Sequence, residues 1–223
     1  MVQNIKNICL LLALLPIIPL YASDTTRSKH TFIFEKNSHF SKPRNLFSRF
    51  INKPDTLKWL CRFDTSSCYS MPLSNGQYHE DQWDYNKLTG ITFTPTNPLH
   101  TTAMVGWRYN PYTHVFELVS YWHIHKKRIF DEKRFVTAQP NEDIYVTMVT
   151  NFEKNEVTII IETKTGTLTE TQKFKKLAQR VSIIQPYFGG TSRAPNTMWL
   201  YCEILNSEKK KKGNNEKSPK INK

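Results

Sequence analysis

One segment of the chain alternates between apolar and chemically active side chains. The odd positions of residues 115–125 carry a carboxylate, a phenol and two imidazoles, from Glu117, Tyr121, His123 and His125. Successive side chains of a β-strand point to opposite faces, so these four groups are expected on one face. Such groups hydrogen-bond sugar hydroxyls, and an aromatic ring stacks on the apolar face of a sugar. The segment predicts a ligand-binding face for a glycan, with a partly solvated outer face as the alternative.

The two histidines of this segment could also share a metal ion. His123 and His125 are expected about 7 Å apart on the same face of a strand. Glu132 is the nearest further ligand, but three cations follow the pair, at positions 126–128. Their charges disfavour a bound cation, and no later histidine completes the site. We expect no metal ion and no cofactor.

Enzymatic activity is left open by the same residues. A retaining glycosidase uses two carboxyl groups about 5 Å apart, and Glu117 has no second acid four residues further on. A polysaccharide lyase instead needs a cation to neutralise a uronate and a base to take a proton. Arg108 could neutralise the uronate, and Tyr121 with His123 or His125 could take the proton.

Short strands must position these residues. Segments rich in Val, Ile, Thr and aromatic residues are separated by turns such as Asn110-Pro111 and Pro140-Asn141. This pattern predicts an all-β fold, an antiparallel β-sandwich of the jelly-roll type. Only residues 40–53 have helical spacing, through Leu46, Phe47, Phe50 and Ile51, and predict one short N-terminal helix. It would pack on the sandwich edge or lie on a membrane surface. The strands are expected at 31–35, 57–63, 89–94, 102–109, 115–125, 128–136, 143–151, 156–163, 168–174, 181–188 and 197–205.

The two ends of the 223-residue chain differ from its middle. Residues 1–22 read as a signal peptide, with Lys6 before a short apolar run and a cleavage site after Ala22; an uncleaved anchor is the alternative. Residues 206–223 carry seven lysines and two glutamates and predict a disordered tail. The domain is therefore 23–205, and only half of the net charge of +12 belongs to it. We expect a secreted, periplasmic or cell-surface protein with no transmembrane span after signal removal and no nucleic-acid partner.

The cysteines fit an oxidising compartment. Cys9 leaves with the signal peptide, so Cys61, Cys68 and Cys202 remain in the mature chain. A bridge between Cys61 and Cys68 would close a short loop and leave Cys202 as a buried thiol in an apolar strand. Pairing of Cys202 with one of the other two is the alternative.

Two segments resemble a known superfamily. The strand with Trp107-Arg108-Tyr109-Asn110 and the turn Tyr187-Phe188-Gly189-Gly190 before a last strand resemble the concanavalin A-like lectin and glucanase jelly roll. Within it, Trp122-His123-Ile124-His125 and the same turn are similar to two segments of alginate lyases. Here His123 stands where those lyases carry glutamine, and their arginine-rich strand has no counterpart. The resemblance implies a sugar ligand on the concave sheet.

These observations together predict an exported, lectin-like protein. Its ligand would be a glycan or polysaccharide, with an acidic glycan favoured by the mild positive charge of the domain. The ligand-binding residues would be Glu117, Tyr121, His123, His125 and Arg108. A polysaccharide lyase and a structural or adhesion protein of the cell envelope without a small ligand are the alternatives.

Overall fold

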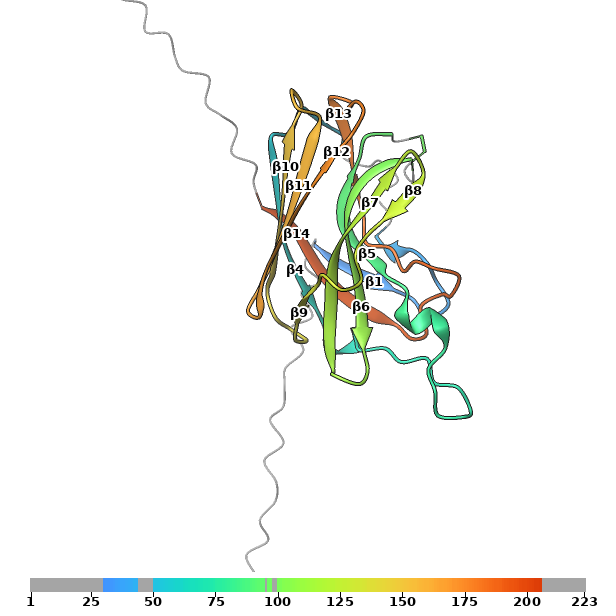
Figure 1. Ribbon diagram of the computed structural model, residues 1–223. Helices are drawn as coiled ribbons and strands as arrows, with labels where there is room; N and C mark the ends of the chain where they lie inside the picture. Colours follow the sequence, from blue (N-terminus) through green and yellow to red (C-terminus); the bar gives the residue numbers. More distant parts are fainter. Residues whose placement is uncertain (1–29, 44–49, 95, 98–99, 206–223) are drawn as a thin grey trace, which may run out of the picture.

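A computed structural model describes residues 30–43, 50–94, 96–97 and 100–205, and they form two antiparallel sheets (Figure 1). The predicted fold class, an all-β antiparallel sandwich, is confirmed. The predicted signal peptide and lysine-rich tail lie outside the described residues. Two short 3-10 helices, η1 (Thr65–Ser67) and η2 (Glu80–Trp83), interrupt the strands. The strands are β1 Thr31–Phe34, β2 Ser41–Lys42, β3 Phe50–Asn52, β4 Thr56–Phe63, β5 Asn86–Thr92, β6 Thr101–Asn110, β7 Val115–Ile124, β8 Lys127–Ile129, β9 Val136–Ala138, β10 Ile144–Asn151, β11 Glu156–Thr163, β12 Gly166–Lys173, β13 Arg180–Ile184 and β14 Met198–Leu205.

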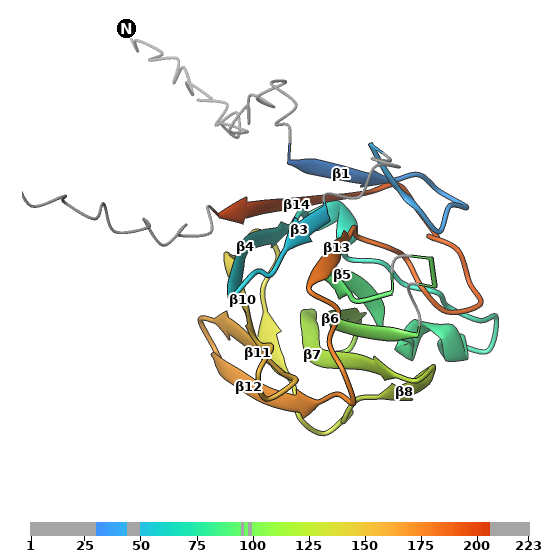
Figure 2. The ribbon, with the colours of Figure 1, turned by 90° about the horizontal axis from the view of Figure 1, so that it is seen from above.

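The chain crosses repeatedly between the two sheets, as in a jelly roll. The first sheet has the order β12-β11-β10-β4-β14-β1-β2, and the second has the order β3-β13-β5-β6-β7-β8 with β9 beside β7. Seen from above, the first sheet curves around the second, which lies on the inside of the bend (Figure 2). The second sheet therefore has one face against the first sheet and one face turned away from it, which we call its inner face.

Aromatic side chains fill the space between the sheets. Phe63 of β4 stacks on Phe116 of β7 with ring centroids 4.2 Å apart, and Trp107 of β6 lies 4.7 Å from Phe63. Trp59 and Trp122 are also fully buried here. Burying each such side chain contributes roughly 1.5–3 kcal/mol, so this layer fixes how the second sheet sits on the first.

Several predicted elements differ from the structure in their bounds or type. The predicted helix at 40–53 is wrong at both described ends: Ser41–Lys42 is strand β2, and Phe50–Asn52 is strand β3. Residues 44–49 lie outside the described part of the chain. The predicted strand 128–136 is two strands, β8 and β9, separated by a turn. In residues 40–53, the helical spacing of a short segment did not outweigh the pairing of β2 with β1 and of β3 with β13.

The cysteines are arranged differently from the predicted Cys61–Cys68 bridge. The sulfur atoms of Cys61 in β4 and Cys202 in β14 lie 2.7 Å apart. Cys68 follows η1, and Cys61, Cys68 and Cys202 are all free thiols. The placement favours Cys202, rather than Cys68, as the partner of Cys61.

Candidate functional site

The inner face of the second sheet carries the side chains that the alternation of β7 predicted. Phe116, Leu118 and Trp122 belong to the core between the sheets, whereas Val119 and Tyr121 form a separate apolar cluster on the opposite face. That face is not open to solvent, however, because Glu117, Tyr121 and His123 are only 5, 3 and 8% exposed. Neighbouring side chains and loops cover the strand.

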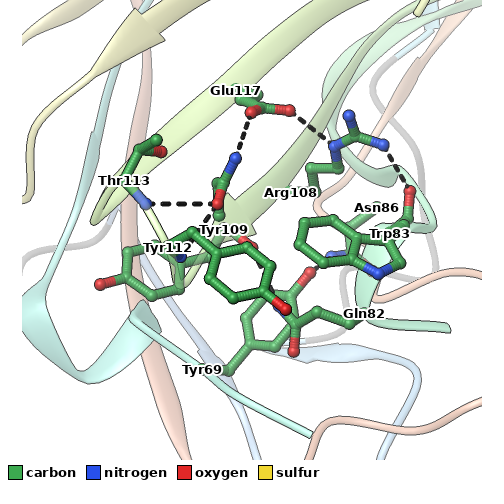
Figure 3. A network of polar contacts seen from close by, with 10 residues as sticks. Tyr69, Gln82, Trp83, Asn86, Arg108, Tyr109, Tyr112, Thr113 and Glu117 are labelled. Atoms are coloured by element: carbon green, nitrogen blue, oxygen red, sulfur yellow. Dashed lines mark hydrogen bonds and ion pairs between the residues drawn. The ribbon is translucent and has the colours of Figure 1, made fainter. Parts of the chain in front are cut away.

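Glu117 and Arg108 form a buried ion pair at one end of this face (Figure 3). Arg108 Nε donates to Glu117 Oε2 over 2.7 Å, and Asn110 Nδ2 donates to Glu117 Oε1 over 2.7 Å. A second guanidinium nitrogen of Arg108 donates to the Trp83 carbonyl at 2.9 Å. Both charges are satisfied within the protein, so this pair holds β6, β7 and η2 together rather than offering groups to a ligand.

A second group of side chains gathers further along the same face, and we name Lys87, Tyr121, His123 and Arg128 the Lys87 cluster. The Lys87 amine lies over the Tyr121 ring, 4.3 Å from its centroid, and the rings of Tyr121 and His123 are 5.5 Å apart. Arg128 of β8 stands opposite His123 in the strand register. In the described part of the chain, no carboxylate lies within ion-pair distance of Lys87 or Arg128. The cluster therefore carries positive charge that the protein does not neutralise by direct pairing.

Burial and mutual repulsion perturb the titration of these groups. Burial, followed by the charge of Arg128, lowers the pKa of the Lys87 amine from 10.5 to about 8, against an opposing effect of Asp84. Burial, followed by the charges of Lys87 and Arg128, also lowers the pKa of His123. Perturbed ionisable groups of this kind concentrate at functional sites. At neutral pH the cluster presents a protonated amine, a guanidinium and a neutral imidazole.

The turn that follows β13 reaches the Lys87 cluster. The backbones of Tyr187 and Lys87 exchange two hydrogen bonds, of 2.8 and 2.9 Å. A Cβ atom on Gly189 would lie 3.0 Å from the Lys87 amine and 3.1 Å from Tyr187 Cε1, so only glycine leaves room for both groups. Gly190 has a φ of +90° beside Asp84. Lys87 thus contacts both Tyr121 of β7 and the turn at Tyr187.

Tyr85 and Phe130 join the two ends of the face. Arg108 lies 4.4 Å from the centroid of the Tyr85 ring, Tyr85 packs against Phe130 at 5.5 Å, and Phe130 stacks on Tyr121 at 5.0 Å. The Tyr85 hydroxyl is buried and has no hydrogen-bond partner among the residues that the structure describes, and burial raises its pKa to about 12. A buried hydroxyl without a partner costs free energy, so Tyr85 marks a point of this face where the packing is kept at a cost to stability.

His125 does not join the other predicted site residues. It lies past the end of β7 in a turn with φ of +51°, is exposed, and makes a ring contact with His100 at 5.5 Å. His123 instead has Nδ1 3.0 Å from the Thr102 hydroxyl. Among the residues that the structure describes, no group of three or more His, Cys, Asp or Glu residues is placed to hold a metal ion. No helix in the same residues is long and apolar enough to cross a membrane.

Sequence reasoning missed Lys87, Arg128 and Tyr85. The strand expected at 89–94 begins three residues earlier, at Asn86, because a bulge between Lys87 and Thr89 breaks the alternation. The strand expected to end at Phe188 stops at Ile184, which leaves Tyr187 in the turn. The cation Arg128 was noted only as unfavourable for a metal ion. Arg128 directly follows the turn after β7, and this position could have indicated that it lies opposite His123.

Comparison with known proteins adds information on architecture only. No family model matches the chain, and no curated protein is similar to it in sequence. Among solved structures, it is similar to a xylan beta-1,4-xylosidase from Bacillus halodurans (TM-score 0.39, 6% identity, 67% of this chain and 28% of that one). It is also similar to a SAP-like pentraxin from Limulus polyphemus (0.34, 10%, 78% and 75%) and to the lectin-like arcelin-5 from Phaseolus vulgaris (0.32, 10%, 69% and 73%).

The chain thus spans about a quarter of the length of the xylosidase. Scores of this size carry no inference about ligand or chemistry. The superfamily resemblance stated from the sequence holds at the level of architecture, where two antiparallel sheets form the sandwich.

Proposed function

We propose that this protein binds an acidic glycan through the Lys87 cluster. The observation that carries the proposal is the proximity of two cations without an ion-paired carboxylate among the described residues: Lys87 lies over the Tyr121 ring, and Arg128 lies over the Phe130 ring that stacks on Tyr121. An anionic sugar would supply the missing negative charge, and the charge-assisted hydrogen bonds would be strong in a partly buried site. Phe130, which is partly exposed and stacks on the buried Tyr121, supplies apolar ring surface for the sugar.

The proposal changes the set of ligand-binding residues. Tyr121 and His123 remain in it, whereas Arg108 and Glu117 serve each other as a buried pair. His125 lies apart, in an exposed turn. Lys87 and Arg128 take their places.

Cleavage of the glycan by β-elimination is a second candidate function. It is favoured by the approach of the Tyr187 ring and the Lys87 amine to the same point beside Gly189. Lys87 or Arg128 would neutralise the uronate carboxylate, and the neutral imidazole of His123 or a tyrosine would accept the proton from C5. The C4=C5 double bond would then form as the C4–O bond breaks, and the departing oxygen would take up a proton from a tyrosine hydroxyl or from water. Binding alone needs only the first of these steps.

A glycan array with uronate-containing, sulfated and neutral oligosaccharides tests the binding proposal. We expect the anionic glycans to bind and the neutral ones of matched length to bind much more weakly. Lys87→Met should weaken binding roughly tenfold or more, because a charge-assisted hydrogen bond is worth about 1.5–3 kcal/mol. Lys58→Met is the matched control, since Lys58 is an exposed lysine of β4 in the other sheet. Absence of binding to every glycan would favour a structural or adhesion role.

Incubation with polyuronates separates binding from cleavage. A lyase would produce an unsaturated uronate with new ultraviolet absorbance, and a binding protein would leave the absorbance unchanged. If product forms, His123→Gln should lower the turnover number more than it changes the Michaelis constant. Product formation unaffected by His123→Gln and Tyr187→Phe would rule out the roles assigned to these side chains.

We also propose that the protein acts outside the cytoplasm, as residues 1–22 suggest. Sequencing the N-terminus of protein secreted from a host with its own leader tests this. A mature chain that begins at Ser23 is expected, and a chain retained with Met1 in the membrane fraction would contradict it.

A further inference from the structure

Cys61 and Cys202 face each other across two neighbouring strands of the first sheet. They are directly opposite in the register of β4 and β14, and their sulfur atoms are 2.7 Å apart. Both side chains are buried, with exposures of 0 and 7%. They are 141 positions apart in the sequence, so only the fold brings them together.

The backbone geometry at this position suits a covalent bridge. Cys202 N–H donates to the carbonyl of His30 over 2.9 Å, on the side of β14 that faces β1. The N–H and C=O of a residue in an antiparallel strand point to the same side, so those of Cys202 point away from β4. Cys61 and Cys202 are therefore a non-hydrogen-bonded pair, in which Cα atoms are about 4.5 Å apart and side chains are closest. This spacing falls within the range of about 4.4–6.8 Å that disulfides span.

Cys68 lacks this arrangement. It follows η1 outside the sheets, is partly exposed, and interacts with Tyr109 rather than with either of the other cysteines. Cys61 has Cys202 as its closest sulfur, and Cys61 is fully buried. We propose that Cys61 and Cys202 form a disulfide when the chain folds in an oxidising environment, and that Cys68 stays a free thiol.

The oxidation is an ordinary thiol–disulfide exchange with a small disulfide such as oxidised glutathione, or with a disulfide-bearing oxidoreductase. The thiolate of one cysteine attacks the donor disulfide, forms a mixed disulfide and releases one donor thiolate, which takes up a proton. The thiolate of the other cysteine then attacks the protein sulfur of the mixed disulfide and releases the second donor thiolate. The protein loses two protons and two electrons, and the donor gains them.

The exchange must take place during folding. Burial strongly raises the pKa of the Cys61 thiol, so little reactive thiolate exists once the sandwich has closed. The bridge would tie the central strand β4 to β14 in the first sheet, while the Lys87 cluster lies on the second. Its loss should therefore change stability and leave glycan affinity unaltered.

The test refolds the reduced, denatured protein in a buffer of oxidised and reduced glutathione, followed by alkylation in denaturant and peptide mapping. We expect one linked peptide pair containing Cys61 and Cys202, the loss of two hydrogens from the intact mass, and full alkylation of Cys68. Cys68→Ser is the matched control and should form the same link. Full alkylation of both Cys61 and Cys202, or a link that includes Cys68, would overturn the proposal.

A thermal measurement on the wild-type protein, refolded with and without an oxidant, tests the proposal independently of the mapping. Protein refolded in the glutathione buffer should unfold at a temperature roughly 10 °C higher than protein refolded with a reductant, because a bridge across a long loop restricts the unfolded chain. Cys61→Ala/Cys202→Ala should unfold at the same temperature with and without glutathione. Equal melting temperatures for the oxidised and reduced wild type would contradict a disulfide at this pair.

Discussion

Replacement of Lys87 by methionine should stabilise the fold while it weakens glycan binding. Methionine keeps a linear, apolar side chain in the space beside Tyr121 and removes the charge. The Lys87 cluster imposes a cost on the folded state because the amine is mostly buried and lies near Arg128. Residues retained at a cost to stability mark functional sites.

The size of the effect follows from the pKa of Lys87. A decrease from 10.5 to about 8 corresponds to about 3 kcal/mol of destabilisation at neutral pH, at about 1.4 kcal/mol for each pH unit. The variant also loses the 2.7 Å hydrogen bond from the amine to the Tyr85 carbonyl, and this loss lowers its stability by about 1 kcal/mol. The net gain is about 1–2 kcal/mol, or an increase of roughly 2–8 °C in melting temperature.

The pH dependence of the unfolding free energy follows from the lowered pKa of Lys87. Between pH 8 and 10.5 the unfolded chain holds a proton on Lys87 that the folded chain has released. The unfolding free energy of the wild type therefore rises with pH across this window and falls as the pH decreases through 8. Lys87→Met lacks this contribution, so its advantage is greatest at pH 7 and disappears above pH 10.5.

Urea unfolding at pH 7, 8.5 and 10 measures these differences. Lys58→Met, at an exposed position of β4, is the control and should follow the wild-type pH dependence. The reasoning is refuted if Lys87→Met is less stable than the wild type at pH 7 and both show the same dependence on pH.

Two further predictions concern the inner face of the second sheet. Glu117→Gln leaves the Arg108 charge buried without its partner, so urea unfolding should show a loss of about 3–5 kcal/mol; a loss under about 1 kcal/mol would mean that the pair is not structural. In Gly106→Ala, the new Cβ would lie 2.9 Å from Val119 Cγ2 and 3.3 Å from Tyr121 Cδ2. Stability should fall by about 1–3 kcal/mol and glycan affinity should fall with it, as calorimetry would detect; unchanged affinity would place the ligand away from Tyr121.

The strand pattern was predictable because alternation is a local property. Phe116, Leu118 and Trp122 occupy the core side of β7 as their positions required. Burial of the opposite face was not predictable, because it depends on which distant segments cover the strand. Tyr121 is covered by Phe130 and Lys87, and the register that places them there is a property of the whole sheet.

The candidate site was only partly predictable for the same reason. Tyr121 and His123 lie on one strand, so alternation alone placed them together. Arg108 and Glu117 are cross-strand partners, and a sequence cannot tell whether two opposite charges neutralise each other or both face a ligand. Lys87 lies in the site because of the bulge in β5, and no local sequence pattern predicts that bulge.

The dependence of glycan affinity on pH tests the central role of Lys87 most directly. Calorimetric titration with an oligouronate, whose carboxylates stay ionised throughout, should give a dissociation constant about tenfold higher at pH 9 than at pH 7, because only about one tenth of the Lys87 amine is protonated at pH 9. Lys87→Met should bind weakly at both pH values. Equal affinities of the wild type at pH 7 and 9, or the same pH dependence in Lys87→Met, would contradict anion recognition by this lysine.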